Sequence, residues 1–177
     1  MRLSILSVVL VVGGMAGLAP RSCWGGEATT RPAELRVLER YIGTRDIEYS
    51  FEPVGAAPIR GRTSVTGKWV LQGAFLQEDY RGEDGSLNRT VMMSFDERAR
   101  AYVLWAFDTS GAWGESRGNR DARERALTWR SKYSTGIEGT GTERHVDENN
   151  GIETAVFKNP KGEIVARGTM AAKRRKG

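Results

Sequence analysis

Charged side chains on the apolar faces of predicted strands are the first candidates for chemistry in this chain. Residues 45–51 alternate between polar and apolar types, which is typical of a half-buried strand, and Arg45 falls on the apolar face. The same alternation puts Glu78 and Arg89 on apolar faces of later segments. Because buried charges need partners, these three residues can satisfy one another if all of them point inward, and they are candidates for ligand binding. The favoured interpretation at this point is that they snorkel at the rim of the fold.

Four tryptophans form a second set of candidates, and each belongs to a different predicted strand: Trp69, Trp105, Trp113 and Trp129. In a closed barrel they converge either as walls of a ligand cavity or as packing outside it. Large aromatic residues on strands are more commonly core than ligand wall. Their role as binding residues therefore depends on whether the interior is open or filled.

The common catalytic and metal-binding motifs are missing from this sequence. His145 is the only histidine, within a polar stretch typical of a solvated surface, and Cys23 is the only cysteine. Without paired histidines or a cysteine cluster, we expect no zinc or haem site and no cofactor. Nucleophile-elbow, P-loop and dinucleotide motifs are also absent, so no catalytic residue is predicted. In an enzyme, Glu78, Arg89 or His145 would be the acid–base candidates.

The elements that position these residues begin with one short helix. Leu35, Leu38 and Ile42 recur at helical spacing, Pro32 suits the first turn, and Gly43 ends the pattern. A helix of this kind directly before a run of strands is expected to act as a lid or plug against a sheet.

After residue 43 the chain reads as strands separated by turn sequences such as Glu83–Ser86, Asn149–Gly151 and Asn159–Gly162. The spacing of about 8 to 12 residues, without helical patterns between, indicates an all-β meander. About ten strands in one antiparallel sheet curl and close, which removes exposed edges. We therefore predict an all-β fold, an antiparallel up-and-down barrel of about ten strands with a short N-terminal helix. A two-sheet sandwich is the alternative.

The N-terminus resembles a targeting segment. Arg2 precedes an apolar run, Leu3–Val12, that is too short to span a bilayer comfortably, and small residues follow. We predict a secretory signal peptide at residues 1–28, a single barrel domain at 29–172 and a basic tail at 173–177. The alternatives are a retained anchor and lipidation of Cys23. The domain is then expected in the periplasm or outside the cell, with no integral membrane segment after signal removal.

The charge distribution argues against a nucleic-acid partner. The chain has 27 Lys plus Arg and 22 Asp plus Glu, for a net charge of +5. Arg2, Arg21 and the basic run at 173–176 account for the whole excess, so the folded part carries balanced charge. A nucleic-acid-binding domain is expected to present a basic face within its fold. The basic run is expected to be a solvated terminus, or a weak contact for anionic lipid.

Residues 35–170 resemble the DUF1579 family, bacterial domains of uncharacterised function. The resemblance is carried by Gly43-Thr44, by Leu71–Gln77 and by Phe95-Asp96. It implies a lipocalin-like β-barrel and no particular activity. The family pattern has tryptophan two residues after the glycine, where this chain has Arg45. We therefore expect Arg45 at the closed end of the barrel near the helix, stacked on an aromatic ring with its head toward a carboxylate or carbonyls.

The leading hypothesis is an exported, lipocalin-like barrel that binds a small, mostly apolar molecule in its lumen without catalysis. Its candidate ligand-binding residues are Arg45, Trp69, Glu78, Arg89, Trp105, Trp113 and Trp129. The alternatives are a structural or interaction domain with a filled core, and an enzyme on a barrel scaffold. A large cavity favours binding, a filled interior favours the structural role, and an inward carboxylate with a raised pKa beside a cavity favours catalysis.

Overall fold

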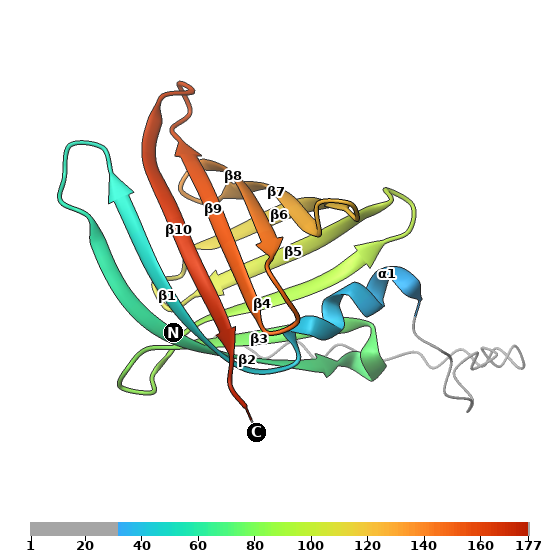
Figure 1. Ribbon diagram of the computed structural model, residues 1–177. Coiled ribbons are helices and arrows are strands. Elements are labelled where there is room, and N and C mark those ends of the chain that lie inside the picture. The colour runs from blue at the N-terminus through green and yellow to red at the C-terminus, as the bar shows by residue number, and fades with distance from the viewer. Residues whose placement is uncertain (1–31, 177) are drawn as a thin grey trace, which may run out of the picture. The chain divides into compact units, whose positions relative to one another are not determined.

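Ten antiparallel strands form a closed barrel with a short helical segment at one end (Figure 1). The structure is a computed structural model that describes residues 32–176. The strands are β1 (Gly43–Pro53), β2 (Ile59–Val70), β3 (Phe75–Arg81), β4 (Leu87–Asp96), β5 (Ala101–Asp108), β6 (Trp113–Asp121), β7 (Ala126–Tyr133), β8 (Glu138–His145), β9 (Asn150–Lys158) and β10 (Ile164–Arg174). A short 3-10 turn, η2 (Leu71–Gly73), connects β2 to β3. The predicted signal peptide lies outside the described residues.

The strand order confirms the predicted up-and-down barrel. Each strand pairs with the next one in sequence, and β1 closes the barrel by pairing with β10 as well as with β2. In the register, Tyr49 on β1 stands opposite Gly61 on β2 and Met170 on β10. Closure leaves no sheet edge unpaired, which removes the aggregation hazard of an open sheet. The alternative of a two-sheet sandwich is wrong.

The predicted helix is present but is short and changes type. It consists of one α-helical turn, α1 (Ala33–Arg36), followed by a 3-10 segment, η1 (Val37–Tyr41). Leu38 and Tyr41 are buried against the barrel interior, so this segment is a plug at one end. A Cβ at Gly67 of β2 would lie 2.0 Å from the carbonyl oxygen of Tyr41. The plug reaches its position because β2 carries no side chain at that point.

The hydrophobic core lies at the plugged end. Its buried members come from the plug and from four strands: Leu38, Tyr41, Leu76, Val91, Met93, Tyr102, Leu127 and Trp129. The hydroxyl of Tyr102 donates a hydrogen bond to the carbonyl oxygen of Glu34 at 3.0 Å, which ties α1 to β5. Within residues 32–176, no helix is long and apolar enough to cross a membrane.

The C-terminal basic run does not begin where it was expected to. Lys173 and Arg174 belong to β10, so the predicted tail boundary at residue 173 is wrong. The guanidinium of Arg174 donates to the carbonyl oxygens of Ile42 at 2.8 Å and Arg40 at 2.5 Å. Arg175 donates from Nε to both carboxylate oxygens of Asp46 at 3.0 Å. These residues are ordered because the start of β1 and the plug offer them hydrogen-bond acceptors.

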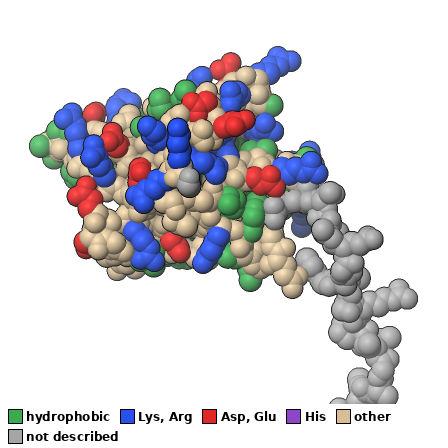
Figure 2. Space-filling model, turned by 60° about the horizontal axis from the view of Figure 1, so that its bottom comes forward, with side chains coloured by type: hydrophobic (Ala, Val, Ile, Leu, Met, Phe, Trp, Pro, Cys, Tyr) green, Lys and Arg blue, Asp and Glu red, His purple; other side chains and the backbone are tan. Residues whose placement is uncertain are grey.

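Basic and acidic side chains are interspersed on the face of the outer wall that Figure 2 shows. Exposed ion pairs of the barrel include Arg62 with Glu48 at 2.8 Å and Arg144 with Glu124 at 3.0 Å. Exposed pairs of this kind contribute little to stability, at most about 1 kcal/mol each. The stability of the barrel therefore depends on its interior.

Candidate functional site

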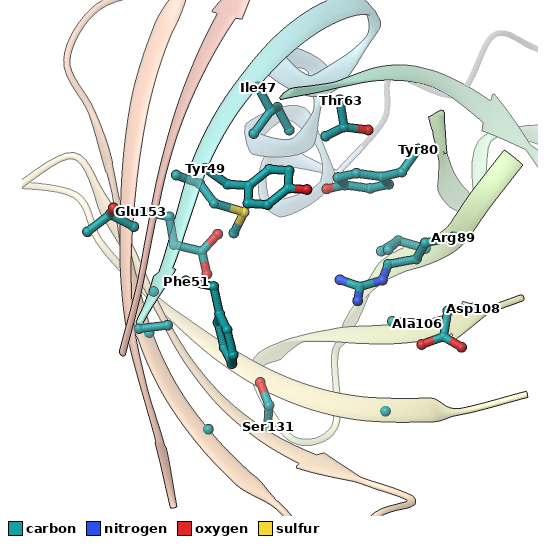
Figure 3. Close-up of a pocket in the computed structure, with 18 of the residues that line it drawn as sticks. Ile47, Tyr49, Phe51, Thr63, Tyr80, Arg89, Ala106, Asp108, Ser131 and Glu153 are labelled. Atoms are coloured by element: carbon teal, nitrogen blue, oxygen red, sulfur yellow. The ribbon is translucent and has the colours of Figure 1, made fainter. Parts of the chain in front are cut away.

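The barrel encloses a cavity of about 1410 Å³. Its wall is formed by inward side chains from all ten strands, and it extends from the plug to turns at the opposite end, where Glu83 and Thr135 line it. Figure 3 shows several of these side chains, including Ile47, Tyr49 and Phe51 of β1, pointing into the space. Drug-sized ligand pockets have volumes of roughly 300–1,000 Å³. The interior beyond the core is thus open rather than filled with side chains.

Glycines opposite aromatic residues keep this space open. In the strand register, five lumen aromatic residues each face an inward glycine: Tyr49 and Gly61, Phe51 and Gly168, Trp129 and Gly118, Tyr133 and Gly114, and Phe157 and Gly139. A ring that packs over a glycine lies along the wall and does not cross the lumen. The aromatic residues therefore line the cavity instead of filling it.

Two of these pairs show how close the contact is. A Cβ at residue 61 would lie 2.5 Å from the Tyr49 hydroxyl oxygen, and one at residue 118 would lie 2.5 Å from Cε3 of Trp129. Neither distance is possible for a real side chain. Any larger residue at Gly61 or Gly118 would push the opposite ring toward the lumen.

Arg45 is buried at the plugged end, with 8% of its surface exposed. Its Nη2 forms an ion pair with Oε1 of Glu78, which is 3% exposed, and the Tyr80 hydroxyl donates to Oε2 of Glu78 at 3.1 Å. The guanidinium carbon lies 4.8 Å from the centroid of the Tyr41 ring. These contacts confirm the expected place of Arg45 near the helix, with an aromatic ring and a carboxylate as its partners. Its Nε has no hydrogen-bond partner among the described residues.

Arg89 does not join this pair. It lies farther from the plug on β4, opposite Asp108 of β5, and Figure 3 shows both side chains on the same side of the cavity. The snorkelling interpretation is therefore wrong for Arg45 and Glu78, which are buried, whereas Arg89 is exposed. The predicted three-way contact is reduced to the pair of Arg45 and Glu78.

A second polar group links the plug to β8. The Tyr41 hydroxyl donates to Oε2 of Glu143 at 2.6 Å, and Nε2 of His145 lies 3.5 Å from Oε1 of the same carboxylate. Burial favours the neutral form of Glu143, but the nearby His145, the Tyr41 hydrogen bond and the charge of Arg45 outweigh burial and lower the pKa of Glu143. The His145 side chain is only 7% exposed, so its interpretation as a solvated surface residue is wrong.

Glu153 is a carboxyl group that faces the open space without a partner among the described residues. It stands on β9 directly opposite Glu143 of β8, and Figure 3 shows it pointing into the cavity. The part of Glu153 that is accessible faces the cavity, and the barrel wall covers the rest of the residue. Burial first, and then the charge of Glu143, raise the pKa of Glu153 to about 7, against the attraction of Arg89. No hydrogen bond or ion pair reaches its carboxyl from the part of the chain that the structure describes.

The predicted site residues divide into two groups. Arg45, Glu78, Arg89 and Trp129 line the cavity. Trp69, Trp105 and Trp113 do not. Trp69 is half-buried against the core, Trp105 lies 6.3 Å from the ring of Phe75, and Trp113 is 52% exposed. The four tryptophans therefore do not converge, and the ligand-binding role of the four lining residues stays a prediction.

Alternation was not applied to two further acidic residues of the lumen, Glu143 and Glu153. Glu153 alternates with Ala155 and Phe157 on one face of β9, and Glu143 alternates with Gly141 on β8. This is the same signal that identified Arg45, a charge on the apolar face of a strand. Alternation applied to β8 and β9 would have found both carboxylates.

The fold and the cavity define the class of protein to which this chain belongs, a closed, ten-stranded, lipocalin-like barrel with a helical plug. No model of a known protein family matches the sequence, and no curated protein is a detectable relative. The resemblance to the DUF1579 family therefore stays a prediction.

Solved structures support the fold assignment. The chain is similar to the S-type phycobiliprotein lyase CPES from Guillardia theta, with 11% identity, a TM-score of 0.60, and coverage of 83% of this chain and 95% of that one. It is also similar to Rv2717c from M. tuberculosis, with 12% identity, a TM-score of 0.62, and coverage of 81% and 98%. A DUF3598 protein from Nostoc punctiforme has 11% identity and a TM-score of 0.56, with 78% of this chain covering 48% of that one.

The buried pair of Arg45 and Glu78 predicts a graded loss of stability on substitution. Arg45→Ala leaves Glu78 buried without its charge partner, and we expect it to lower the free energy of unfolding by about 3 kcal/mol. Arg45→Lys should fall between this variant and the parent, because an ammonium pairs with the carboxylate but lacks the flat guanidinium. Urea unfolding measures both. Arg62→Ala, which removes an exposed pair on β2, is the control and should change stability by less than about 1 kcal/mol. Equal effects of Arg45→Ala and Arg62→Ala would contradict the assignment.

The raised pKa of Glu153 predicts that the free energy of unfolding decreases as the pH rises. The folded protein holds this proton more tightly than the unfolded chain, so ionisation of Glu153 removes stability as the pH rises from about 4.5 to about 7. Glu153→Gln escapes the penalty and should be more stable than the parent by about 2–3 kcal/mol at pH 8, with little difference at pH 4. Urea unfolding at the two pH values measures this. Glu138→Gln, on the outer wall of β8, is the control. A gain for Glu153→Gln that is the same at both pH values would contradict the burial argument.

Proposed function

We propose that this chain is an exported, lipocalin-like barrel that binds one small, mostly apolar molecule in its lumen and does not catalyse a reaction on it. The cavity of about 1410 Å³, with apolar and aromatic walls and a few polar groups, carries the proposal. Ligand sites have this concave, mainly apolar character, with a small number of polar groups that fix orientation. At 11–12% identity the similar structures support the fold and do not identify the ligand.

The construction of the wall supports binding over a purely structural role. Protein interiors are normally close-packed, and empty apolar volume lowers stability. Here, five glycine–aromatic pairs keep the rings along the wall, so that these side chains do not fill the interior. A barrel that served only as a scaffold would be expected to fill this space with side chains. The wall is therefore built to admit a molecule.

Glu153 favours a second candidate function, acid–base catalysis on the bound molecule. Its pKa of about 7 suits proton transfer near neutral pH, and it borders the cavity. Binding is the stronger proposal because it accounts for the whole wall, whereas catalysis accounts for one residue. Incubation of a bound compound with the protein, followed by product analysis, separates the two functions.

Binding in the lumen is tested with the uncharged fluorophore N-phenyl-1-naphthylamine. We expect a saturable rise in fluorescence with the parent protein. Ala155→Trp should weaken binding about tenfold or more, because residue 155 stands between Gly141 and Gly168 in the register and a large side chain there enters the lumen. Thr154→Trp, on the outer face of the same strand, is the control and should bind like the parent.

Two outcomes contradict the proposal: no binding by the parent, or equal binding by a folded Ala155→Trp variant. Circular dichroism shows whether that variant folds. If it does not, Ala106→Phe on β5 tests the opposite wall of the same cavity with a smaller change.

Export is part of the same proposal, as is membership of the DUF1579 family. The basic start and apolar run Leu3–Val12 support export, and the single cysteine, Cys23, falls within the proposed signal. N-terminal sequencing of protein from the cell envelope or medium should find a start between Trp24 and Thr29. Protein that keeps Met1 and stays in the cytosol would contradict export without affecting the binding proposal.

A further inference from the structure

Six of the charged residues that line the cavity form three pairs, and two of these pairs are balanced. Arg45 and Glu78 form a buried ion pair, and Arg89 stands opposite Asp108 across β4 and β5. The third pair, Glu143 and Glu153, joins two acidic residues across β8 and β9. Like charges directly opposite each other on a sheet are destabilising. The lumen thus has one place where positive charge is lacking.

Within the acidic pair, Glu153 is the residue that lacks a hydrogen-bond donor or a cation. Glu143 accepts a hydrogen bond from Tyr41 and lies beside His145. Glu153 has neither a donor nor a cation in contact among residues 32–176, and its carboxyl group faces open space. A Cβ at Gly141 would lie 3.1 Å from Oε1 of Glu153, so the carboxyl group rests against bare backbone on β8. An enclosed carboxylate without a cationic partner favours the binding of a cation from outside the chain.

Aromatic rings extend from this carboxylate toward the open end. Phe157 is four residues from Glu153 on the same inward face of β9, and its ring lies 5.6 Å from that of Phe51 and 6.1 Å from that of Tyr133. Figure 3 shows Tyr49 and Phe51 on either side of Glu153 in that view. Aromatic faces attract cations and also pack against apolar groups.

We infer that the ligand of the lumen is an apolar amine, whose ammonium group binds Glu153 while its apolar body packs against Phe51, Tyr133 and Phe157. The inference rests on the proposed function of binding in this cavity and names the chemical class of the ligand. An ammonium supplies both the hydrogen-bond donors and the positive charge that Glu153 lacks. It also relieves the repulsion between Glu153 and Glu143.

Other ligand classes fit this wall less well. A carboxylate ligand would add a third negative charge beside Glu143 and Glu153, and near Arg89 it would approach Asp108, which stands opposite Arg89 in the register. A neutral ligand fills the apolar space but leaves the repulsion between the two acidic residues unchanged. An amine is the class that satisfies the charge and the apolar wall together.

The affinity for an amine depends on the ionisation of Glu153. The titratable and charged groups that act on this residue are Glu143 on β8, Arg89 on β4, Tyr80 on β3 and Tyr133 on β7. At pH 5 Glu153 is mostly protonated and offers no charge to an ammonium, whereas at pH 8 it is mostly ionised. An alkylammonium stays protonated at both values. Amine binding is therefore stronger at pH 8.

The test compares three ten-carbon probes that differ only in their head group: decylamine, decanol and decanoate. Each displaces N-phenyl-1-naphthylamine from the parent, from Glu153→Gln and from Glu138→Gln. At pH 8 the parent should bind decylamine about tenfold more tightly than decanol, and decanoate most weakly. Glu153→Gln should lose the preference for decylamine and retain its affinity for decanol. Glu138→Gln removes the same charge from the outer wall of β8 and should behave like the parent.

Each outcome separates the ligand class from the binding function. Equal affinity of the parent for decylamine and decanol at pH 8 overturns the amine inference while lumen binding stands. A decylamine preference that survives in Glu153→Gln, or that does not weaken from pH 8 to pH 5, also overturns it. Failure of every probe to displace the fluorophore overturns the inference as well, and failure of the fluorophore itself to bind overturns the proposed function with it.

Discussion

The buried guanidinium of Arg45 is the contact on which the plugged end of the barrel depends. It joins the ring of Tyr41 on the plug to Glu78 on the barrel wall. The polar contacts continue through the Tyr41 hydroxyl to Glu143 on β8 and through Glu78 to Tyr80. Such a network is favourable only when its members are satisfied. Because Arg45 pairs with Glu78 and Tyr41 pairs with Glu143, the plugged end of the cavity is polar but its two carboxylates already have partners. Glu153, farther along the wall, has none among the described residues.

The cavity itself follows from strand number and side-chain size. A barrel of about eight strands is just wide enough for its side chains to fill, and each added strand widens the interior. Ten strands leave space that the core of the plugged end does not occupy. Glycines at positions such as Gly61 and Gly118 then keep the opposite rings along the wall. Width and glycine placement act together, since neither a narrower barrel nor bulkier residues would leave the same volume.

In the proposed complex, the apolar wall and the unsatisfied carboxylate would have different roles: the wall would give affinity, and the carboxylate would select the ligand by its charge. The aromatic and aliphatic side chains supply affinity that is roughly proportional to buried area and does not depend on direction. In the proposed amine complex, Glu153 would supply a direction and a preferred charge, because an enclosed charge strongly favours a partner of opposite sign. Barrels that have only about a tenth of their residues in common with this chain share its fold, and a shared fold does not determine function.

The sequence by itself determined the elements and the inward placement of several charges, because alternation with period two is a local property of a strand. It predicted the barrel of about ten strands, the plug, and the place of Arg45 at the closed end of the barrel, but it left the burial of Glu78 open. It did not determine the inner face of β5, where residues 102–107 are apolar on both sides, and so Trp105 was a candidate for the lumen although Leu104 and Ala106 line it. Only the tertiary structure decided which distant residues meet, as Arg45 does with Glu78 across 33 positions, because strand register is set by all pairings in the closed sheet together. The same is true of the basic residues at 173–175, whose order depends on acceptors supplied by the start of β1 and by the plug.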